Sequence, residues 1–324
     1  MEWSEESVMK ELISKFSVAS GFLILLCGLG WGLGFVINEY EILAKEHEGL
    51  LPASQQISLE SCENGSERKV RTFAVDGQAA RDIPVLTYHR IIDDKDIEER
   101  HYIKGELNPM IVKKSDFKKQ MNYLKKEGYV TLTLNELYSF LSNKMPIPEK
   151  SVVLTFDDGY KDNYVEAYPI LKEYDFRAVN FLITGTTTNR VHTYTPEYVQ
   201  YFSAKELRKG CDVFEYQSHT YSYHKKEKIS GRANKTPYLL SKSKNEVAKD
   251  LKTSVFQLGG EKLGFAYPYG EYSPESIEIL KGAGFKMAFT TEERLASSKD
   301  HLFEIPRFQI FSKTTFKEFK QYVK

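Results

Sequence analysis

The chain is poor in cysteine and tryptophan and carries no net charge. Its 324 residues include three cysteines, too few and too scattered for a disulfide framework or a cysteine zinc site. An oxidising compartment would allow Cys62 and Cys211 to pair, and the sequence leaves this open. The 45 basic and 45 acidic side chains balance, which excludes a nucleic-acid binder that works by bulk electrostatics.

Charge is also missing from one long stretch, Phe16 to Ile37. As a helix, its 22 residues would span about 33 Å, enough to cross a bilayer core of about 30 Å. A buried core helix is disfavoured by its five glycines, which weaken soluble helices but are common in membrane helices. A cleaved signal peptide is disfavoured because residues 38–41 offer no small-residue cleavage site, and bulky Leu26 before Cys27 is unlike a lipoprotein signal. We therefore expect a transmembrane signal anchor over residues 16–37.

The basic residues around this span indicate its orientation. Lys10 and Lys15 precede it and Lys45 follows it closely, so a slight positive-inside bias places residues 1–15 in the cytoplasm. The chain beyond Ile37 would then lie outside.

The glycines of the expected anchor also have a regular spacing. They form two overlapping Gly-x-x-x-Gly patterns, which pack helix dimers in membranes, at Gly28, Gly30, Gly32 and Gly34. A dimer through this helix is therefore an expectation. Residues 38–81 lack periodicity and mix charges with Ser, Gln, Asn and Gly, which is typical of a linker or stalk.

Residues 82–324 alternate between strand-like and helix-like stretches. The predicted strands are 84–89, 129–132, 151–156, 178–183, 213–217, 263–267, 285–290 and 304–308. The predicted helices are 116–127 with Ser115 as its cap, 134–141, 164–174, 204–209, 244–258, 274–281 and 316–323. This alternation predicts parallel strands with crossover helices, in an α/β barrel or an open sheet. In either architecture the carboxyl ends of the strands carry the chemistry.

Two carboxylates, Asp157 and Asp158, end the strand at 151–156 and precede Gly159. Adjacent side chains of a strand point to opposite faces, but a glycine turn breaks this alternation and lets both carboxylates face one pocket. Neighbouring carboxylates push their pKa values apart, so that one can hold a metal while the other handles a proton. The alternative is an Asp-Gly pair that only makes a turn.

Histidines follow two other predicted strands. His89 ends the first strand of the domain, and His219 and His224 follow the strand at 213–217. Two imidazoles and one carboxylate make a three-ligand set that leaves positions open for water and substrate, as hydrolytic metal sites need. Spacing alone does not establish such a site.

Three motifs in this order resemble the polysaccharide deacetylases of carbohydrate esterase family 4. They are Thr155-Phe-Asp-Asp-Gly159, His219-Thr-Tyr-Ser-Tyr-His224 and Tyr267-Pro-Tyr-Gly270. The resemblance covers roughly residues 84–308. The spacing of five between the histidines, and the strand end Leu86-Thr-Tyr-His89, resemble the branch that deacetylates poly-β-1,6-N-acetylglucosamine.

The resemblance implies a distorted (β/α) barrel that hydrolyses N-acetyl groups of a sugar polymer. It also implies a divalent metal, zinc with nickel, cobalt or iron as alternatives, that acidifies the attacking water and polarises the acetyl carbonyl. Its ligands by motif would be Asp158, His219 and His224. Asp157 would be the general base, and the backbone N–H of Tyr269 would donate to the oxyanion. Ser218 or Thr220 would orient the first imidazole.

The chain departs from the family pattern in three places. Ala266 stands where the family has an arginine that holds the catalytic aspartate, and Arg307 is our candidate to supply that charge. The late tryptophan motif is missing, and so is the Leu-x-x-x-His ending that donates the catalytic acid. His89 is our candidate to protonate the leaving amine, with His301 as a substitute. The insertion 225–244, rich in Lys and Ser, is expected to form a mobile loop beside the metal.

We therefore expect a single-pass protein of a bacterial cell membrane with an extracellular deacetylase barrel over residues 82–324. The preferred substrate is a poly-N-acetylglucosamine exopolysaccharide of biofilms. A peptidoglycan N-acetylglucosamine deacetylase would share every catalytic residue and is the alternative enzyme. A non-catalytic glycan-binding envelope protein is disfavoured by the intact aspartates and histidines. A structural helix-dimer anchor would explain the glycines but not the motifs.

Overall fold

The computed structural model describes residues 28, 32–33, 49–59, 62, 69–73, 75, 79–142 and 145–324. The expected cytoplasmic segment 1–15 and nearly all of the expected anchor 16–37 lie outside these residues, so the anchor, its orientation and its dimer stay predictions. In the described part of the chain, no helix combines the length and the apolar character needed to cross a bilayer. A compact unit begins at Gly49 and runs to Lys324.

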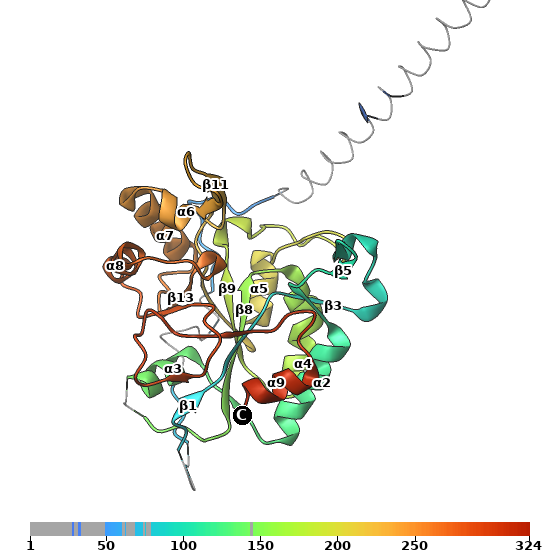
Figure 1. Cartoon of the computed structure of the whole chain (residues 1–324), viewed down its shortest axis with the longest axis vertical. Coiled ribbons are helices and arrows are strands. Elements are labelled where there is room, and N and C mark those ends of the chain that lie inside the picture. The colour runs from blue at the N-terminus through green and yellow to red at the C-terminus, as the bar shows by residue number, and fades with distance from the viewer. Residues whose placement is uncertain are drawn as a thin grey trace, which may run out of the picture. The chain divides into compact units, whose positions relative to one another are not determined.

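A curled sheet of parallel strands forms the centre of this unit (Figure 1). Its order is β14-β13-β10-β9-β8-β2-β16, with β7 beside β8, and the neighbours pair in parallel. The strands are β2 (Val85–Tyr88), β7 (Val130–Thr131), β8 (Ser151–Asp158), β9 (Ala178–Leu182), β10 (Phe214–Ser218), β13 (Gly264–Ala266), β14 (Met287–Phe289) and β16 (Phe308–Gln309).

One short segment joins the two edges of this sheet. Ile305 bridges Phe289 of β14, and three residues later Phe308 of β16 pairs with Leu86 of β2. The sheet is thereby brought round on itself, as in a barrel whose last strand is broken. The predicted distorted (β/α) barrel is confirmed as a barrel-like fold.

Helices connect the strands and cover the sheet, with α2, α4 and α9 on one side of the view and α7 and α8 on the other (Figure 1). They are α2 (Lys114–Lys126), α3 (Leu134–Leu141), α4 (Tyr168–Glu173), α5 (Ala204–Gly210), α6 (Tyr238–Ser241), α7 (Lys244–Gln257), α8 (Pro274–Ala283) and α9 (Phe316–Tyr322). Capping boxes fix several of their starts, for example Thr133 with Glu136 and Ser243 with Glu246. Ser115 does not cap α2 as predicted. It lies inside the helix and donates to Asp94.

Four small strand pairs lie outside the main sheet. They are β1 (Asp82–Ile83) with β15 (Ala296–Ser297), β3 (Arg90–Ile92) with β6 (Ile111–Lys113), β4 (Tyr102–Ile103) with β5 (Glu106–Leu107), and β11 (Lys226–Lys228) with β12 (Lys235–Pro237). The last pair contradicts the expected loop at 225–244, because this insertion forms an antiparallel hairpin followed by α6.

The alternation of β8 divides its side chains between two cores. Val152, Leu154 and Phe156 pack with the helices that cover the sheet, in the largest apolar cluster. Val153 packs with residues of β2, β9 and β14 inside the barrel. By the same alternation Asp157 points into the barrel, toward its inner core.

Some of the described residues between Gly49 and Arg81 pack against the barrel, unlike the residues of a stalk. Leu51 and Ile57 are buried in the main core, and a disulfide joins Cys62 to Cys211 at the end of α5. The expected linker 38–81 therefore overlaps the compact unit. The physical reason is that two apolar side chains and one cysteine find partners that lie far away in the sequence, which local periodicity does not reveal.

We expect the disulfide to contribute substantially to stability. It closes a loop of 149 residues, so replacing Cys62 and Cys211 by Ser should lower the free energy of unfolding by roughly 2–5 kcal/mol. Urea denaturation of the fragment from Gly49 onward measures this. Dithiothreitol should bring the unsubstituted fragment down to the variant's stability and leave the variant unchanged. Equal stability of oxidised fragment and variant would contradict the prediction.

Candidate active site

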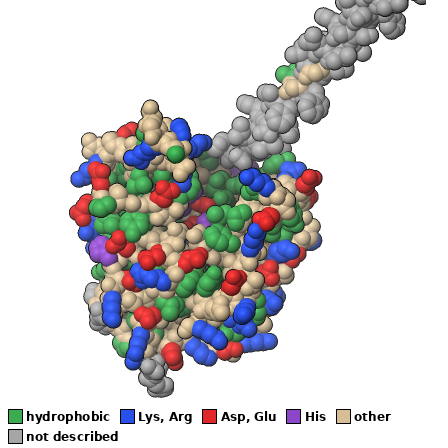
Figure 2. All heavy atoms as spheres, viewed as in Figure 1, with side chains coloured by type: hydrophobic (Ala, Val, Ile, Leu, Met, Phe, Trp, Pro, Cys, Tyr) green, Lys and Arg blue, Asp and Glu red, His purple; other side chains and the backbone are tan. Residues whose placement is uncertain are grey.

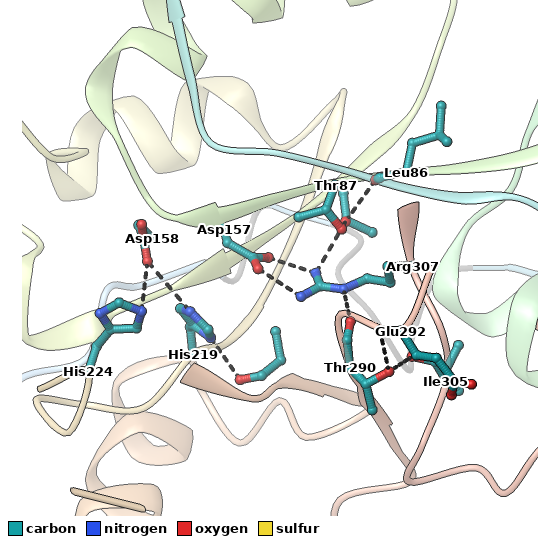
Figure 3. A network of polar contacts seen from close by, with 12 residues as sticks. Leu86, Thr87, Asp157, Asp158, His219, His224, Thr290, Glu292, Ile305 and Arg307 are labelled. Atoms are coloured by element: carbon teal, nitrogen blue, oxygen red, sulfur yellow. Dashed lines mark hydrogen bonds and ion pairs between the residues drawn. The ribbon is translucent and has the colours of Figure 1, made fainter. Parts of the chain in front are cut away.

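The two aspartates at the end of β8 point in different directions although both border the same site (Figure 3). Asp158 has φ +74° and Gly159 has φ +76°, so the strand leaves its regular conformation at Asp158 itself. A Cβ on Gly159 would lie 2.8 Å from Leu182 Cδ2, so the turn also needs glycine there. Asp157 stays inside the barrel, while the turned backbone aims Asp158 at the histidine loop.

Asp158, His219 and His224 meet at the carboxyl ends of β8 and β10. The Nε2 atoms of His219 and His224 lie 3.5 Å and 3.4 Å from Asp158 Oδ1, and one ligand atom from each residue lies within 4.8 Å of the others. Asp158 Oδ1 is buried and has no hydrogen-bond partner in the described part of the chain. Two imidazoles and a carboxylate oxygen suit zinc and related divalent cations, so these residues fit the expected metal.

His219 is held in the form that can bind a cation. Its Nδ1 lies 2.7 Å from the carbonyl oxygen of Ala266, which can only accept, so Nδ1 carries the proton and Nε2 has a free lone pair. Burial, opposed by the two aspartates, lowers the pKa of His219 to about 4, so the imidazole is neutral at neutral pH. The prediction that Ser218 or Thr220 orients this ring is wrong, because Ser218 bonds Ser254 and the backbone carbonyl does the orienting.

The loop between the two histidines is fastened by a carboxylate that the sequence did not reveal. Asp250 of α7 accepts from the backbone N–H groups of Tyr221 and Ser222, each at 2.8 Å. Its burial raises the pKa of the carboxyl, and the donated hydrogen bonds oppose this. The signal was too weak to find, since a single acid on a predicted helix usually faces solvent.

Asp157 is paired with the fully buried Arg307 (Figure 3). Nη1 and Nη2 of Arg307 donate to Oδ1 and Oδ2 of Asp157, both at 2.8 Å, and Nε donates to the carbonyl of Thr290 at 3.0 Å. Burial alone would raise the pKa of Asp157, but the guanidinium charge and the neighbouring histidines lower it to about 2. The structure thus brings Arg307 to the aspartate from the segment that closes the barrel.

His89 borders the same site, whereas His301 does not. The charge of His89 helps to lower the pKa of Asp157, and its Nδ1 is buried without a hydrogen-bond partner among the described residues. Asn163 fixes the backbone of His89 by donating to its carbonyl oxygen at 2.7 Å. His301 is about half exposed, and its Nδ1 lies 3.4 Å from Glu304.

Tyr269 forms an exposed wall next to the cluster. Its backbone has φ +62°, its ring centroid lies 4.4 Å from that of His224, and its hydroxyl donates to the His224 carbonyl oxygen at 3.2 Å. Left-handed backbone at a non-glycine residue is typical of functional sites. Asp158, Thr220 and Tyr269 all have it at this site.

Tyr160 is a further neighbour that the sequence analysis missed. Burial, and then the negative charge of Asp158, raise the pKa of its hydroxyl well above the ordinary value, so it stays protonated as a donor. Its ring stacks on that of Tyr201 at 5.5 Å. The signal was its place directly after the motif that ends at Gly159.

Comparison with known proteins agrees with this site. A family model described as polysaccharide deacetylase matches residues 144–288. The poly-beta-1,6-N-acetyl-D-glucosamine N-deacetylase of Staphylococcus aureus strain MSSA476 is 30% identical over 234 residues, 69% of this chain and 77% of that protein. The chain belongs to the polysaccharide deacetylase family. It is therefore a de-N-acetylase.

Two solved structures have a fold similar to that of this chain. The Streptococcus pyogenes deacetylase PplD in complex with acetate matches with a TM-score of 0.62 and 28% identity, covering 75% of this chain and 98% of that one. IcaB from Ammonifex degensii matches with a TM-score of 0.60 and 24% identity, covering 76% and 97%. At that identity the second match shows the fold alone.

A second acidic cluster of the deacetylase already contains an ammonium group. Asp93, Asp96 and Glu166 also lie close together, but Lys114 Nζ is 2.7 Å from Glu166 and 3.1 Å from Asp93. The ammonium group therefore stands where a cation would bind.

Proposed function

We propose that the protein is a metal-dependent N-deacetylase of an extracellular poly-N-acetylglucosamine exopolysaccharide. The observation that carries this is the 30% identity, over 77% of its length, with a deacetylase named for the β-1,6-linked polymer. The five-residue step from His219 to His224 supports the same branch.

In this proposal Asp158, His219 and His224 hold the divalent cation, zinc with nickel, cobalt or iron as alternatives. When bound, such a cation lowers the pKa of water and polarises a carbonyl oxygen. The neutral His219 and the unpaired oxygen of Asp158 are prepared for it without a prior loss of protons.

Asp157 is the proposed general base, and Arg307 its positioning residue. With a pKa of about 2 the carboxylate is ionised at neutral pH and accepts the proton that the attacking water gives up. The two hydrogen bonds from Arg307 fix the plane of the carboxylate and keep it from turning toward the histidines.

The remaining steps need one donor for the oxyanion and one for the leaving group. The backbone N–H of Tyr269 is proposed to donate to the oxygen that becomes negative when water adds to the acetyl carbon. His89 is proposed to give its proton to the sugar nitrogen as the carbon–nitrogen bond breaks, so that acetate and a free amine leave.

Replacing His89 by Ala is expected to lower kcat about 10²- to 10³-fold, because the amine then leaves without a positioned proton donor. Metal content should stay at the unsubstituted level, since His89 is not among the proposed ligands. Acetate release and metal analysis of the purified protein measure both. His301→Ala is the matched control, and a normal rate for His89→Ala would move the role to another group.

We also propose that residues 16–37 anchor the enzyme in the cell membrane, with the barrel outside. The Cys62–Cys211 disulfide supports an oxidising environment for the barrel, because such bonds persist outside the cytoplasm. Reactivity of these cysteines with a membrane-impermeant thiol reagent in intact cells, after mild reduction, tests the orientation.

Acetate release from matched oligomers tests the substrate. The fragment from Gly49 should release acetate faster from β-1,6-linked than from β-1,4-linked N-acetylglucosamine pentamers. The reverse preference would favour a peptidoglycan N-acetylglucosamine deacetylase. Release from neither, with metal bound, would favour the non-catalytic glycan-binding protein.

A further inference from the structure

The hairpin β11–β12 carries a concentration of positive charge. It projects at the top of the domain beside α6, where Lys and Arg side chains gather (Figures 1 and 2). Four of its basic residues are exposed and form no ion pair with any residue that the structure describes, namely Lys225, Lys228, Arg232 and Lys235. The single acid of the hairpin, Glu227, is taken by Lys242 at 2.7 Å.

The arrangement of these charges is unfavourable for the hairpin itself. Lys228 and Lys235 face each other directly across the two strands. Like charges in opposite positions destabilise a strand pair. Within the hairpin, Lys228 donates to the carbonyl oxygen of Ala233 and Arg232 to the hydroxyl of Thr236, but neither acceptor carries a charge. The positive charge of the hairpin is therefore not neutralised, which points to a partner or a repelled ligand.

The hairpin is also fixed to the wall of the active site. It begins directly after the proposed metal ligand His224. Its first strand residue, Lys226, has its ammonium 4.2 Å from the centroid of the Tyr269 ring and 2.6 Å from Glu271. The ring of Tyr269 in turn lies against His224. The first strand of the hairpin therefore starts beside the active site, and Lys228 ends that same strand two residues after Lys226.

The proposed reaction changes the charge of its polymer. An N-acetylglucosamine unit is neutral, whereas each product unit carries an amine that is largely protonated near neutral pH. We propose that the β11–β12 hairpin is a specificity element that repels glucosamine next to the reacting unit, so that the enzyme favours acetylated stretches. This rests on the proposed poly-N-acetylglucosamine activity.

The alternative is that the positive charge of the hairpin attracts an anionic polymer. The repulsion of product is favoured because the glycan in the name of the S. aureus relative carries no acid, and its deacetylation creates only positive charge. The anionic polymer becomes an outcome of the test.

The test compares kcat/KM for acetate release by the full chain in detergent on two β-1,6-linked pentamers. One is fully acetylated, and the other has a single glucosamine beside the central unit. The preference is the ratio of kcat/KM at the central unit of the fully acetylated pentamer to that of the pentamer with glucosamine. This ratio should be about fivefold larger for the unsubstituted enzyme than for Lys228→Glu/Lys235→Glu. Raising the salt to 0.5 M should remove most of this difference, because the screening length then falls to about 4 Å.

Two further variants make the result specific. Lys228→Gln/Lys235→Gln removes the two charges without reversing them, so it should change the logarithm of this ratio about half as much. Lys249→Glu/Lys252→Glu, which changes two exposed lysines of α7, should keep the unsubstituted ratio. All variants should release acetate from the fully acetylated pentamer, which shows that they fold.

Three results would overturn the proposal. An unchanged ratio in the hairpin variants, with acetate release intact, removes the hairpin's role and leaves the proposed function standing. If that ratio is unchanged and the hairpin variants no longer deacetylate an acid-bearing β-1,4 glycan, the hairpin binds anionic polymers instead. No acetate from either pentamer by the unsubstituted enzyme refutes the proposed function and the inference with it.

Discussion

Removal of the divalent cation is expected to abolish acetate release, and His219→Ala is expected to have the same effect by removing a ligand. We expect a loss of at least about 10³-fold, because the proposed cation would supply both the acidified water and the polarised carbonyl. The neutral Nε2 of His219 faces Asp158 across 3.5 Å, and no other described imidazole replaces it there. Metal analysis should show roughly one ion per chain before the substitution and almost none after it.

The control for this prediction is to add the metal back. Chelated enzyme should recover its rate on addition of zinc, whereas His219→Ala should not recover at comparable concentrations. His301→Ala should retain both metal and rate, since His301 pairs with Glu304 away from the cluster. Full activity after exhaustive chelation would show that the three residues do not act through a metal.

The stability of the metal-free protein should depend on pH because the buried His219 is neutral in the folded state. Burial lowers the pKa of this residue from an ordinary value of 6.5 to about 4. Between these values the unfolded chain binds more protons than the folded one, so stability should fall as the pH drops from 6.5 to 4. His219→Ala should lose this dependence, which urea denaturation at several pH values would show.

Local patterns in the sequence predicted the alternating strands and helices, whereas the barrel was implied by the family resemblance. The predicted helix 134–141 agrees with α3, and the predicted helix 244–258 ends within one residue of α7. The apolar run with Val152 and Val153 predicted a buried strand, and it is buried because one side of β8 meets the helices and the other meets the barrel interior. These features depend on neighbours in the chain, which periodicity reports directly.

Long-range contacts account for what was missed. They do not account for Arg307, which was predicted as the partner of Asp157 although 150 residues separate the two. Ala266 was recognised as a missing arginine, but its carbonyl oxygen proved to orient His219, and a backbone group leaves no sequence signal. The insertion 225–244 looked like a solvated loop because its charges are not those of a stable strand pair.

Asp157→Asn is expected to lower kcat by about 10³-fold or more with metal content retained, since Asn cannot take a proton from water and Asp158 remains. The same change leaves the fully buried Arg307 without its counter-charge, at a cost of about 3–5 kcal/mol in the free energy of unfolding. Asp300→Asn, which removes a carboxylate paired with Arg294, is the control, and it should keep the rate. An unchanged rate in Asp157→Asn would exclude it as the base.

Substituting Arg307 as well separates the effect of Asp157 on stability from its effect on the rate. Arg307→Met alone should destabilise the protein, whereas Asp157→Asn/Arg307→Met should recover much of the stability of either single variant, because no buried charge is left unpaired. Activity should not recover in the double variant. If rate followed stability across the set, Asp157 would be a structural residue. If stability recovers while the rate stays low, the carboxylate itself does the chemistry.

The pH dependence of Arg307→Met distinguishes positioning from folding in the same way. In the unsubstituted protein the pKa of Asp157 is lowered from 3.8 to about 2, so its contribution to stability is present above 3.8 and lost as the pH falls toward 2. Without the guanidinium, burial is the main remaining influence and raises that pKa. The acidic limb of kcat should then move upward, and the variant should regain part of its rate as the pH rises. A limb that stays in place would mean that Arg307 supports the fold but does not keep Asp157 ionised.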